Sequence, residues 1–157
     1  MQPGDDVGPP KSWISFKFRK PANRFEVVTS ISTGLICRIA GPYRAGKYHD
    51  LTIFRIGGLK QLLQECGEKA EADKGYRGEP DTIELPDDGI VDQYHEKALI
   101  RSRHETINGK IKNWQCMNTV FRHDIHLHGT FFIAVCTIIN IQIMSGEKMV
   151  FQVEYNG

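Results

Sequence analysis

The sequence predicts a single mixed α/β domain, and three observations support this fold class. The chain has 157 residues, of which 40% are apolar and 25% charged, the usual balance of a globular domain with a core. Alternating, β-branched stretches dominate the first third, and helical periodicity follows them. Strands that come first, with helices between and after them, indicate α/β packing. We expect a disordered start at 1–11, a folded domain at 12–145 and a tail at 146–157.

The first predicted element is a β-hairpin over 24–40. The stretch RFEVVTSI alternates along its length, STG forms the turn, and LICRIA is the returning strand. A loop containing glycine and proline leads from there to Asp50. Helical spacing then runs over 51–67, and because Gly57 and Gly58 interrupt it, we expect two short helices there.

The second half of the chain predicts two longer helices. Asp73 stands at the end of a short predicted strand, and an acidic loop follows at 78–89. Apolar residues recur at spacings of three, four and seven over about 95–114, which indicates an amphipathic helix. The last helix, over about 125–143, is apolar nearly all round, so we expect it to be central. The tail at 148–155 could add an edge strand.

Composition narrows the functional classes. A net charge of +1 argues against binding nucleic acid through bulk charge, although it leaves a local basic surface open. The four cysteines form no CxxC pair and follow no recognisable signal peptide, so we expect reduced thiols and a protein that is not secreted. The longest apolar run, 131–143, contains polar residues and is too short to predict a membrane span.

Two acids form the candidate site. Asp73 ends a strand, a place where functional residues of α/β sheets gather. Glu105 lies on the polar stripe of the long helix, between Arg101 and Lys112. Two carboxylates from separate elements can hold Mg²⁺ together with water and a phosphate. The alternative is that Glu105 only forms a solvated ion pair with its basic neighbours.

Four blocks occur in a fixed order along 13–143: RFEVVTSISTGLICRIAGPYRAGKYHDLTIFR, EADKGYRG, RSRHETINGKIKNW and FRHDIHLHG. In this order they resemble the catalytic domain of the DDE superfamily endonucleases, in particular the transposase-derived, PIF/Harbinger-like branch. The resemblance implies an RNase H-like fold, a mixed sheet flanked by helices. It also implies metal-dependent cleavage and transfer of DNA strands, with Mg²⁺ or Mn²⁺ as cofactor and DNA as partner. The implied location is the nucleus, the other possibility being the cytoplasm.

The resemblance assigns roles to both acids. Asp73 matches the second catalytic acid of the family and Glu105 the third, so both would be catalytic and bind metal. The first acid of the family stands in an Asp-Gly-Thr-like strand, at a place where this chain has MQPGDDVGPPK. We therefore expect an N-terminally truncated domain that lacks its first strand, is inactive alone and leaves DNA recognition to a separate protein. The alternative is a non-catalytic remnant that binds DNA or protein.

Two further residues have alternative interpretations. Asp50 is either an additional metal ligand or the N-cap of a helix beginning at Leu51. His104 is either a core histidine or a group that supports its neighbour Glu105 as a ligand.

Five cations are candidates for contacting DNA: Lys17, Arg19, Lys20, Arg101 and Lys112. The first three alternate with aromatic residues, a pattern that fits a DNA-backbone contact and fits equally the solvent face of an amphipathic strand. The last two either contact phosphates or pair with Glu105.

Overall fold

The computed structural model describes residues 10–17, 19, 21–85 and 94–147. Its strands are β1 Asn23–Thr29, β2 Ile36–Arg44, β3 Ala70–Glu71 and β4 Ile83–Glu84. Its α-helices are α1 Asp50–Ile56, α2 Leu59–Cys66, α3 Tyr94–Asn113, α4 Gln115–Asn118 and α5 His128–Met144. Short 3-10 turns cover η1 Pro10–Ser12, η2 Lys74–Tyr76 and η4 Ile125–Leu127. The predicted mixed α/β class is confirmed.

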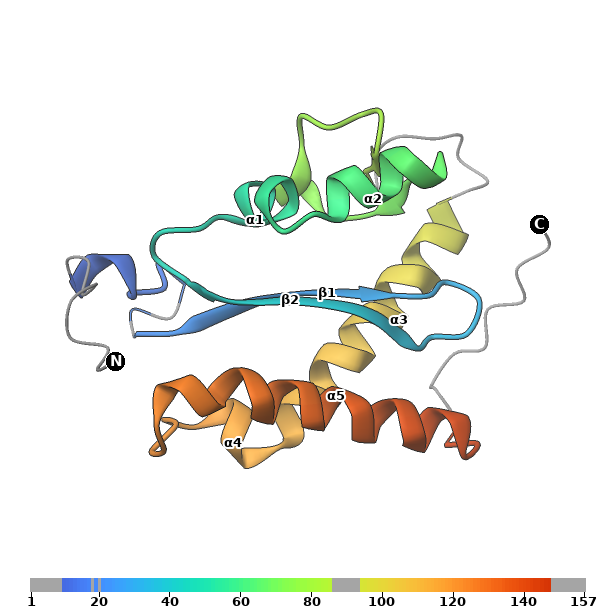
Figure 1. Cartoon of the computed structure of the whole chain (residues 1–157). Helices are drawn as coiled ribbons and strands as arrows, with labels where there is room; N and C mark the ends of the chain where they lie inside the picture. Colours follow the sequence, from blue (N-terminus) through green and yellow to red (C-terminus); the bar gives the residue numbers. More distant parts are fainter. Residues whose placement is uncertain (1–9, 18, 20, 86–93, 148–157) are drawn as a thin grey trace.

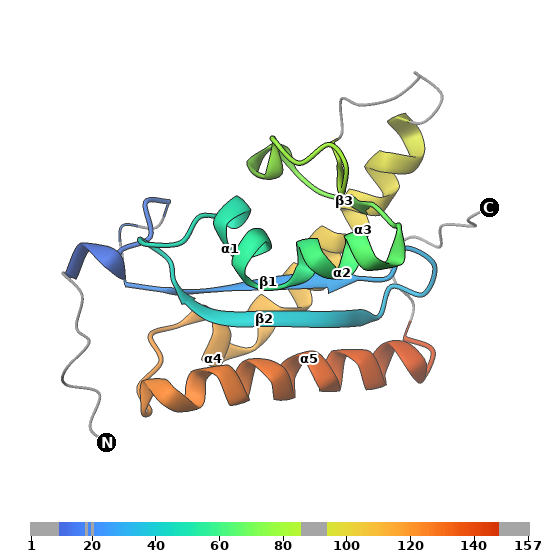
Figure 2. The ribbon, with the colours of Figure 1, turned by 45° about the horizontal axis from the view of Figure 1, so that its top comes forward.

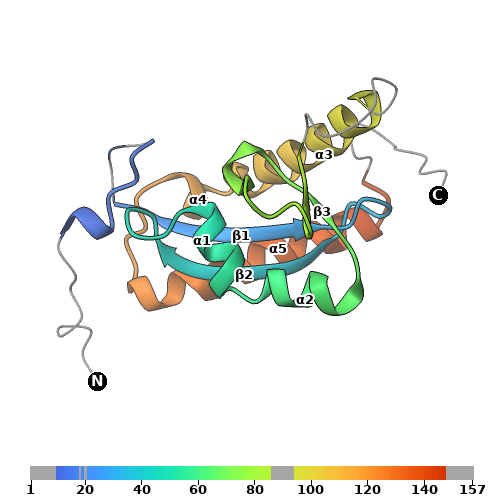
Figure 3. The same ribbon diagram turned by 90° about the horizontal axis from the view of Figure 1, so that it is seen from above.

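The β1–β2 hairpin forms a middle layer. Helices α1 and α2 cover one face, and α4 and α5 lie on the other (Figure 1, Figure 2). Helix α3 runs along the β1 side of the hairpin, away from β2 (Figure 3). Side chains of β1 alternate between the two faces: Phe25 stacks on Phe132 of α5, whereas Arg24 pairs with Asp50 of α1.

The second sheet is a short parallel pair of strands. Ala70 lies opposite Ile83 and Glu71 opposite Glu84, and no backbone ladder joins this pair to the hairpin in the described part of the chain. The described residues therefore form two small sheets, one antiparallel and one parallel, where the sequence predicted a single mixed sheet. Strand β4 lies in 78–89, which the sequence predicted as a loop, and it forms because the Ile83 side chain is buried in the core.

Two apolar clusters lie on the two faces of the hairpin. One joins Ile36 of β2 to α3 and α5 through Ile107 and Ile139, which are fully buried. The other joins α1 and α2 to β4 through Phe54 and Ile83. Burial of each such side chain contributes roughly 1.5–3 kcal/mol, so the two clusters are the main source of stability.

The predicted helix boundaries agree with the structure to within a few residues. The two short helices are confirmed, with Gly57 ending α1 and a left-handed Gly58 preceding α2. The predicted disordered start overlaps the turn η1, and its residues 1–9 lie outside the described residues. The tail strand expected at 148–155 lies outside them as well.

Helix α5 is less buried than predicted. Its buried stripe consists of Phe132, Val135, Cys136 and Ile139. The expectation of a central helix is wrong, because the hairpin and α3 cover one side, while Ile133, Ile141 and Met144 remain 54%, 57% and 75% exposed. The helical segment Ile125–Met144, with a mean hydropathy of 1.7, is long and apolar enough to cross a membrane by length and composition. Core helices of soluble proteins meet the same criteria.

Asn140 of α5 completes the hydrogen bonding at the start of β2. Its Oδ1 accepts from the Ile36 backbone N–H and its Nδ2 donates to the Ile36 carbonyl, both at 2.8 Å. We expect Asn140→Ala to lower the free energy of unfolding by about 2 kcal/mol, because both backbone groups lose their partner in a half-buried place. Urea unfolding measures the loss. Gln142→Ala, an exposed change on the same helix, should cost less than about 0.5 kcal/mol, and equal losses would contradict this role of Asn140.

Candidate functional site

Asp73 lies just beyond β3, as the sequence predicts, and begins the turn η2. Its Oδ1 accepts a hydrogen bond from the Gly75 backbone N–H at 2.8 Å, and its side chain is exposed. A Cβ atom at position 75 would lie 2.9 Å from this oxygen, closer than real Cβ atoms approach. A side chain at this position would therefore displace the Asp73 carboxylate from its place over the backbone of the turn.

Asp50 brings a second carboxylate to the same place. The Cβ position of Gly75 lies 3.5 Å from Asp50 Oδ2, and the other oxygen, Oδ1, accepts from Arg24 Nη1 at 3.0 Å. The interpretation of Asp50 as an N-cap is wrong: α1 starts at Asp50 itself, and His49 precedes it without a side-chain capping bond. The guanidinium on β1 orients the carboxylate instead. The second oxygen of Asp50, Oδ2, lies on the side of Gly75, as Oδ1 of Asp73 does.

A third carboxyl group, that of Glu26, was missed by sequence reasoning. Glu26 lies opposite Ala40 in the hairpin and is 5% exposed. Neither of its carboxyl oxygens has a hydrogen-bond partner among the residues that the structure describes. Burial raises its pKa to about 7; the charge of Arg38 lowers the pKa and that of Asp50 raises it. The available signal was a glutamate inside a β-branched strand, since a buried carboxyl without a partner is costly and seldom retained for packing.

Tyr76 lies within the influence of all three acids. Its ring packs edge-on against Phe54, with 5.9 Å between ring centroids. Its phenol pKa is raised, first by burial and then by the negative charges of Glu26, Asp50 and Asp73. Three carboxyl groups from β1, α1 and the β3–η2 turn thus act on one hydroxyl group. The charge of Arg24 lowers the pKa of the same hydroxyl group, so its guanidinium offsets part of the negative charge gathered there.

His104 connects α3 to this region. Its Nδ1 lies 3.4 Å from Thr29 Oγ1 of β1. Burial lowers the His104 pKa, while the charges of Asp73 and Glu105 raise it. Glu105 is exposed, and no hydrogen bond or ion pair joins it to Asp73 within the described residues. The structure thus brings Asp73 to Asp50, and it relates Glu105 to Asp73 only through the imidazole that both influence.

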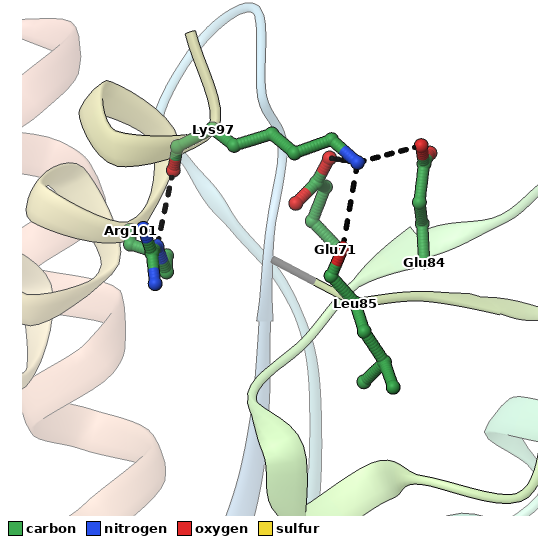
Figure 4. Close-up of polar contacts among 5 residues, drawn as sticks. All are labelled: Glu71, Glu84, Leu85, Lys97 and Arg101. Atoms are coloured by element: carbon green, nitrogen blue, oxygen red, sulfur yellow. Dashed lines mark hydrogen bonds and ion pairs between the residues drawn. The ribbon is translucent and has the colours of Figure 1, made fainter. Parts of the chain in front are cut away.

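Lys97 of α3 holds the parallel sheet in place (Figure 4). Its Nζ lies 2.8 Å from Glu84 Oε1 on β4 and 3.9 Å from Glu71 Oε1 on β3. The lysine side chain is 6% exposed. Burial raises the pKa of Glu71, and the ammonium group of Lys97 lowers it. Because β3 leads directly into Asp73, this cluster positions the site as well as the sheet.

The predicted DNA-contacting cations do not form one surface. Lys17 and Lys112 line the same cavity, on the hairpin face opposite α1. Arg19 is exposed in the turn before β1. Arg101 lies one helical turn beyond Lys97 in α3, and its Nε donates to the Lys97 carbonyl at 3.4 Å (Figure 4). The remaining candidate, Lys20, lies outside the described residues.

Comparisons with protein-family models, with curated proteins and with solved structures find no match. Over the described ranges of the chain, no group of three or more His, Cys, Asp or Glu side chains is arranged to hold a metal ion. The candidate site is therefore a pair of carboxylates, Asp50 and Asp73, with Glu26 buried nearby.

Proposed function

We propose that this chain is an RNase H-like domain of the DDE endonuclease type, built for metal-dependent cleavage and transfer of DNA strands. The observation that carries the proposal is the approach of Asp50 and Asp73 to one point beside Gly75. The two carboxylates come from a helix start and a strand end, so the fold, rather than a single loop, brings them together. The four DDE-like sequence blocks support the same activity.

The donor set suits Mg²⁺ or Mn²⁺. Mg²⁺ is usually bound in proteins by one or two carboxylates together with water and a substrate phosphate. Asp50 and Asp73 would supply the two carboxylates, and Glu105 is the further acid that α3 would contribute. A divalent ion held there would supply charge stabilisation to a phosphodiester under attack.

Three neighbouring groups set the charge of this site. Arg24 neutralises part of the Asp50 charge through its ion pair. Glu26, with a pKa of about 7, carries only part of a negative charge at neutral pH. His104 stays neutral there because burial lowers its pKa, so its ring can orient nearby groups without adding positive charge.

We expect Asp73→Asn to weaken Mn²⁺ binding by about tenfold or more, because an amide replaces one of two carboxylate ligands. Calorimetric titration with Mn²⁺ measures the change. Asp124→Asn is a matched control, because Asp124 begins the turn η4 and its Oδ1 accepts from the His126 backbone N–H at 3.0 Å, as Asp73 does in η2. Equal Mn²⁺ affinity in the wild-type protein and Asp73→Asn would contradict the metal site.

A second candidate function is a non-catalytic DNA-binding module. The observation that favours it is the cavity lined by Lys17 and Lys112, which lies on the other face of the hairpin from the Asp50–Asp73 pair. A binding module of this kind would bind DNA equally in the presence of a chelator, and Asp73→Asn would leave that binding unchanged.

A further inference from the structure

A cavity of about 320 Å³ lies between β1, α3 and the start of α5. Its volume is at the lower end of the range for ligand pockets, roughly 300–1,000 Å³, which suits a ligand the size of one nucleotide rather than a duplex. The residues that matter to its chemistry are Lys17, Arg24, Phe25, Asn108, Lys112 and Phe132.

One wall of the cavity is aromatic. The rings of Phe25 and Phe132 are stacked, with 3.8 Å between centroids and 5° between planes, and His128 lies 5.5 Å from Phe25. Nδ1 of His128 is 3.0 Å from the Asn23 amide nitrogen. Because burial lowers the His128 pKa, the neutral ring accepts this hydrogen bond and keeps a proton on Nε2 as a donor. Phe132 is 7% exposed, so a base would meet mainly the half-buried ring of Phe25, and nucleobases stack on aromatic rings with little dependence on sequence.

The charge of the cavity is entirely positive. Lys17 comes from the segment before β1, Arg24 from β1 and Lys112 from α3, and none of the described residues that line the cavity is acidic. The whole chain carries a net charge of only +1, so this grouping is local. Both lysines are exposed to solvent, where they can meet a phosphate.

Arg24 connects the cavity with the acidic site. It lines the cavity and also donates to Asp50 at 3.0 Å. The cavity and the Asp50 carboxylate thus share one guanidinium group, although they lie on opposite faces of the hairpin.

We propose that this cavity holds one unpaired nucleotide of a DNA strand, with the base against the Phe25–Phe132 wall and its phosphates at Lys17 and Lys112. The choice of DNA as the ligand rests on the proposed function. The inference adds that the preferred substrate is a strand with an unpaired segment. A base buried in so small a cavity must first leave its stack, which costs least where the strand is already single.

Fluorescence anisotropy with a labelled oligothymidylate, measured in EDTA, tests the cavity without any metal. We expect Lys112→Ala to weaken binding about fivefold and to reduce the slope of log K against log salt by about 0.7, as for the loss of one phosphate contact to a single strand. Lys112→Arg should restore both values. Asn108→Phe keeps every charge but fills the cavity, and should weaken binding about tenfold or more.

Lys69→Ala is the matched charge control, since Lys69 is exposed, lies before β3 and donates to the Pro80 carbonyl away from the cavity. It should change the affinity by less than about twofold. Equal losses in Lys69→Ala and Lys112→Ala, or wild-type affinity in a folded Asn108→Phe protein, would overturn the proposal. So would tighter binding of the matching duplex than of the single strand. None of these results alters the Mn²⁺ test of Asp73, so the two proposals can fail separately.

Discussion

Lys97→Met is expected to lower the free energy of unfolding by about 3 kcal/mol near neutral pH, because it leaves a buried carboxylate without its cation. Lys97 is nearly fully buried between Glu71 and Glu84, and the Glu71 side chain is only 13% exposed. Without the ammonium group of Lys97, the pKa of Glu71, which burial already raises, rises further. The Glu71 carboxyl group of the variant therefore takes up a proton as the pH falls toward 5, and the loss of unfolding free energy should become smaller.

Urea unfolding of Lys97→Met, and of the double variant with Glu71→Gln, measures this effect. The double variant should recover about 2 kcal/mol, because the amide carries no charge that needs a partner. Lys60→Met is a control on α2, where the lysine is one-third exposed and its partner Glu79 keeps a second cation, Arg55, at 2.6 Å. If Lys97→Met lowered the free energy of unfolding no more than Lys60→Met does, the cluster in Figure 4 would contribute no more to stability than an exposed ion pair.

Glu26 is expected to make the protein less stable as the pH rises. Its pKa is about 7 in the folded protein, compared with an ordinary value of 4.5. The folded state therefore holds the proton more tightly than the unfolded chain, and this contribution is complete below about pH 4.5 and lost as the pH passes through 7. Between about pH 5 and about pH 8.5, Glu26 alone should lower the free energy of unfolding by about 2–3 kcal/mol.

Comparison with Glu26→Gln isolates this contribution from other titrating groups. The difference in unfolding free energy between the wild-type protein and the variant should change by about 2–3 kcal/mol over that pH range, in favour of the variant at high pH. Chemical denaturation at several pH values in EDTA provides the measurement. A difference that stays constant with pH would show that the carboxyl group titrates as it does in the unfolded chain.

Local sequence patterns predicted much of the fold. Alternating residues and a turn motif were sufficient to predict the β1–β2 hairpin, because its two strands are adjacent in the sequence and the turn sets their register. The break at Gly57 and Gly58 was readable because glycine ends α1 and supplies the left-handed conformation before α2. Helix α3 followed from its apolar spacing, with Ile107 and Ile111 on the buried face.

The parts that failed depend on long-range packing. Strand β4 has two residues, too few for any periodic pattern, and it exists because Ile83 enters a core formed mainly by α1 and α2. The apolar sequence of α5 predicted full burial, but only a neighbouring layer can provide burial, and the hairpin covers a single stripe of the helix. An apolar composition allows a helix to be buried on every side, but the neighbouring elements determine how much of its surface is covered.

The candidate site shows the same division. Asp73 was identified from its place after a strand and before a glycine-aromatic turn, both of which are local features. The pairing of Asp50 with Arg24 and the burial of Glu26 depend on contacts between different elements. Neither feature can therefore be predicted from the spacing of residues along the chain. Glu105 was predicted to meet Asp73, and this remains a prediction, as the structure relates the two acids only through His104.

The separation of the two sheets has a consequence for cooperativity. No backbone ladder joins β3–β4 to the hairpin within the described residues, so the parallel pair can open without breaking any hydrogen bond of β1 or β2. We therefore expect two opening units of different protection, with the loop that carries Asp73 in the smaller one. The fraction of molecules with Asp73 in place is then governed by a local equilibrium, which can shift while the larger unit remains fully folded.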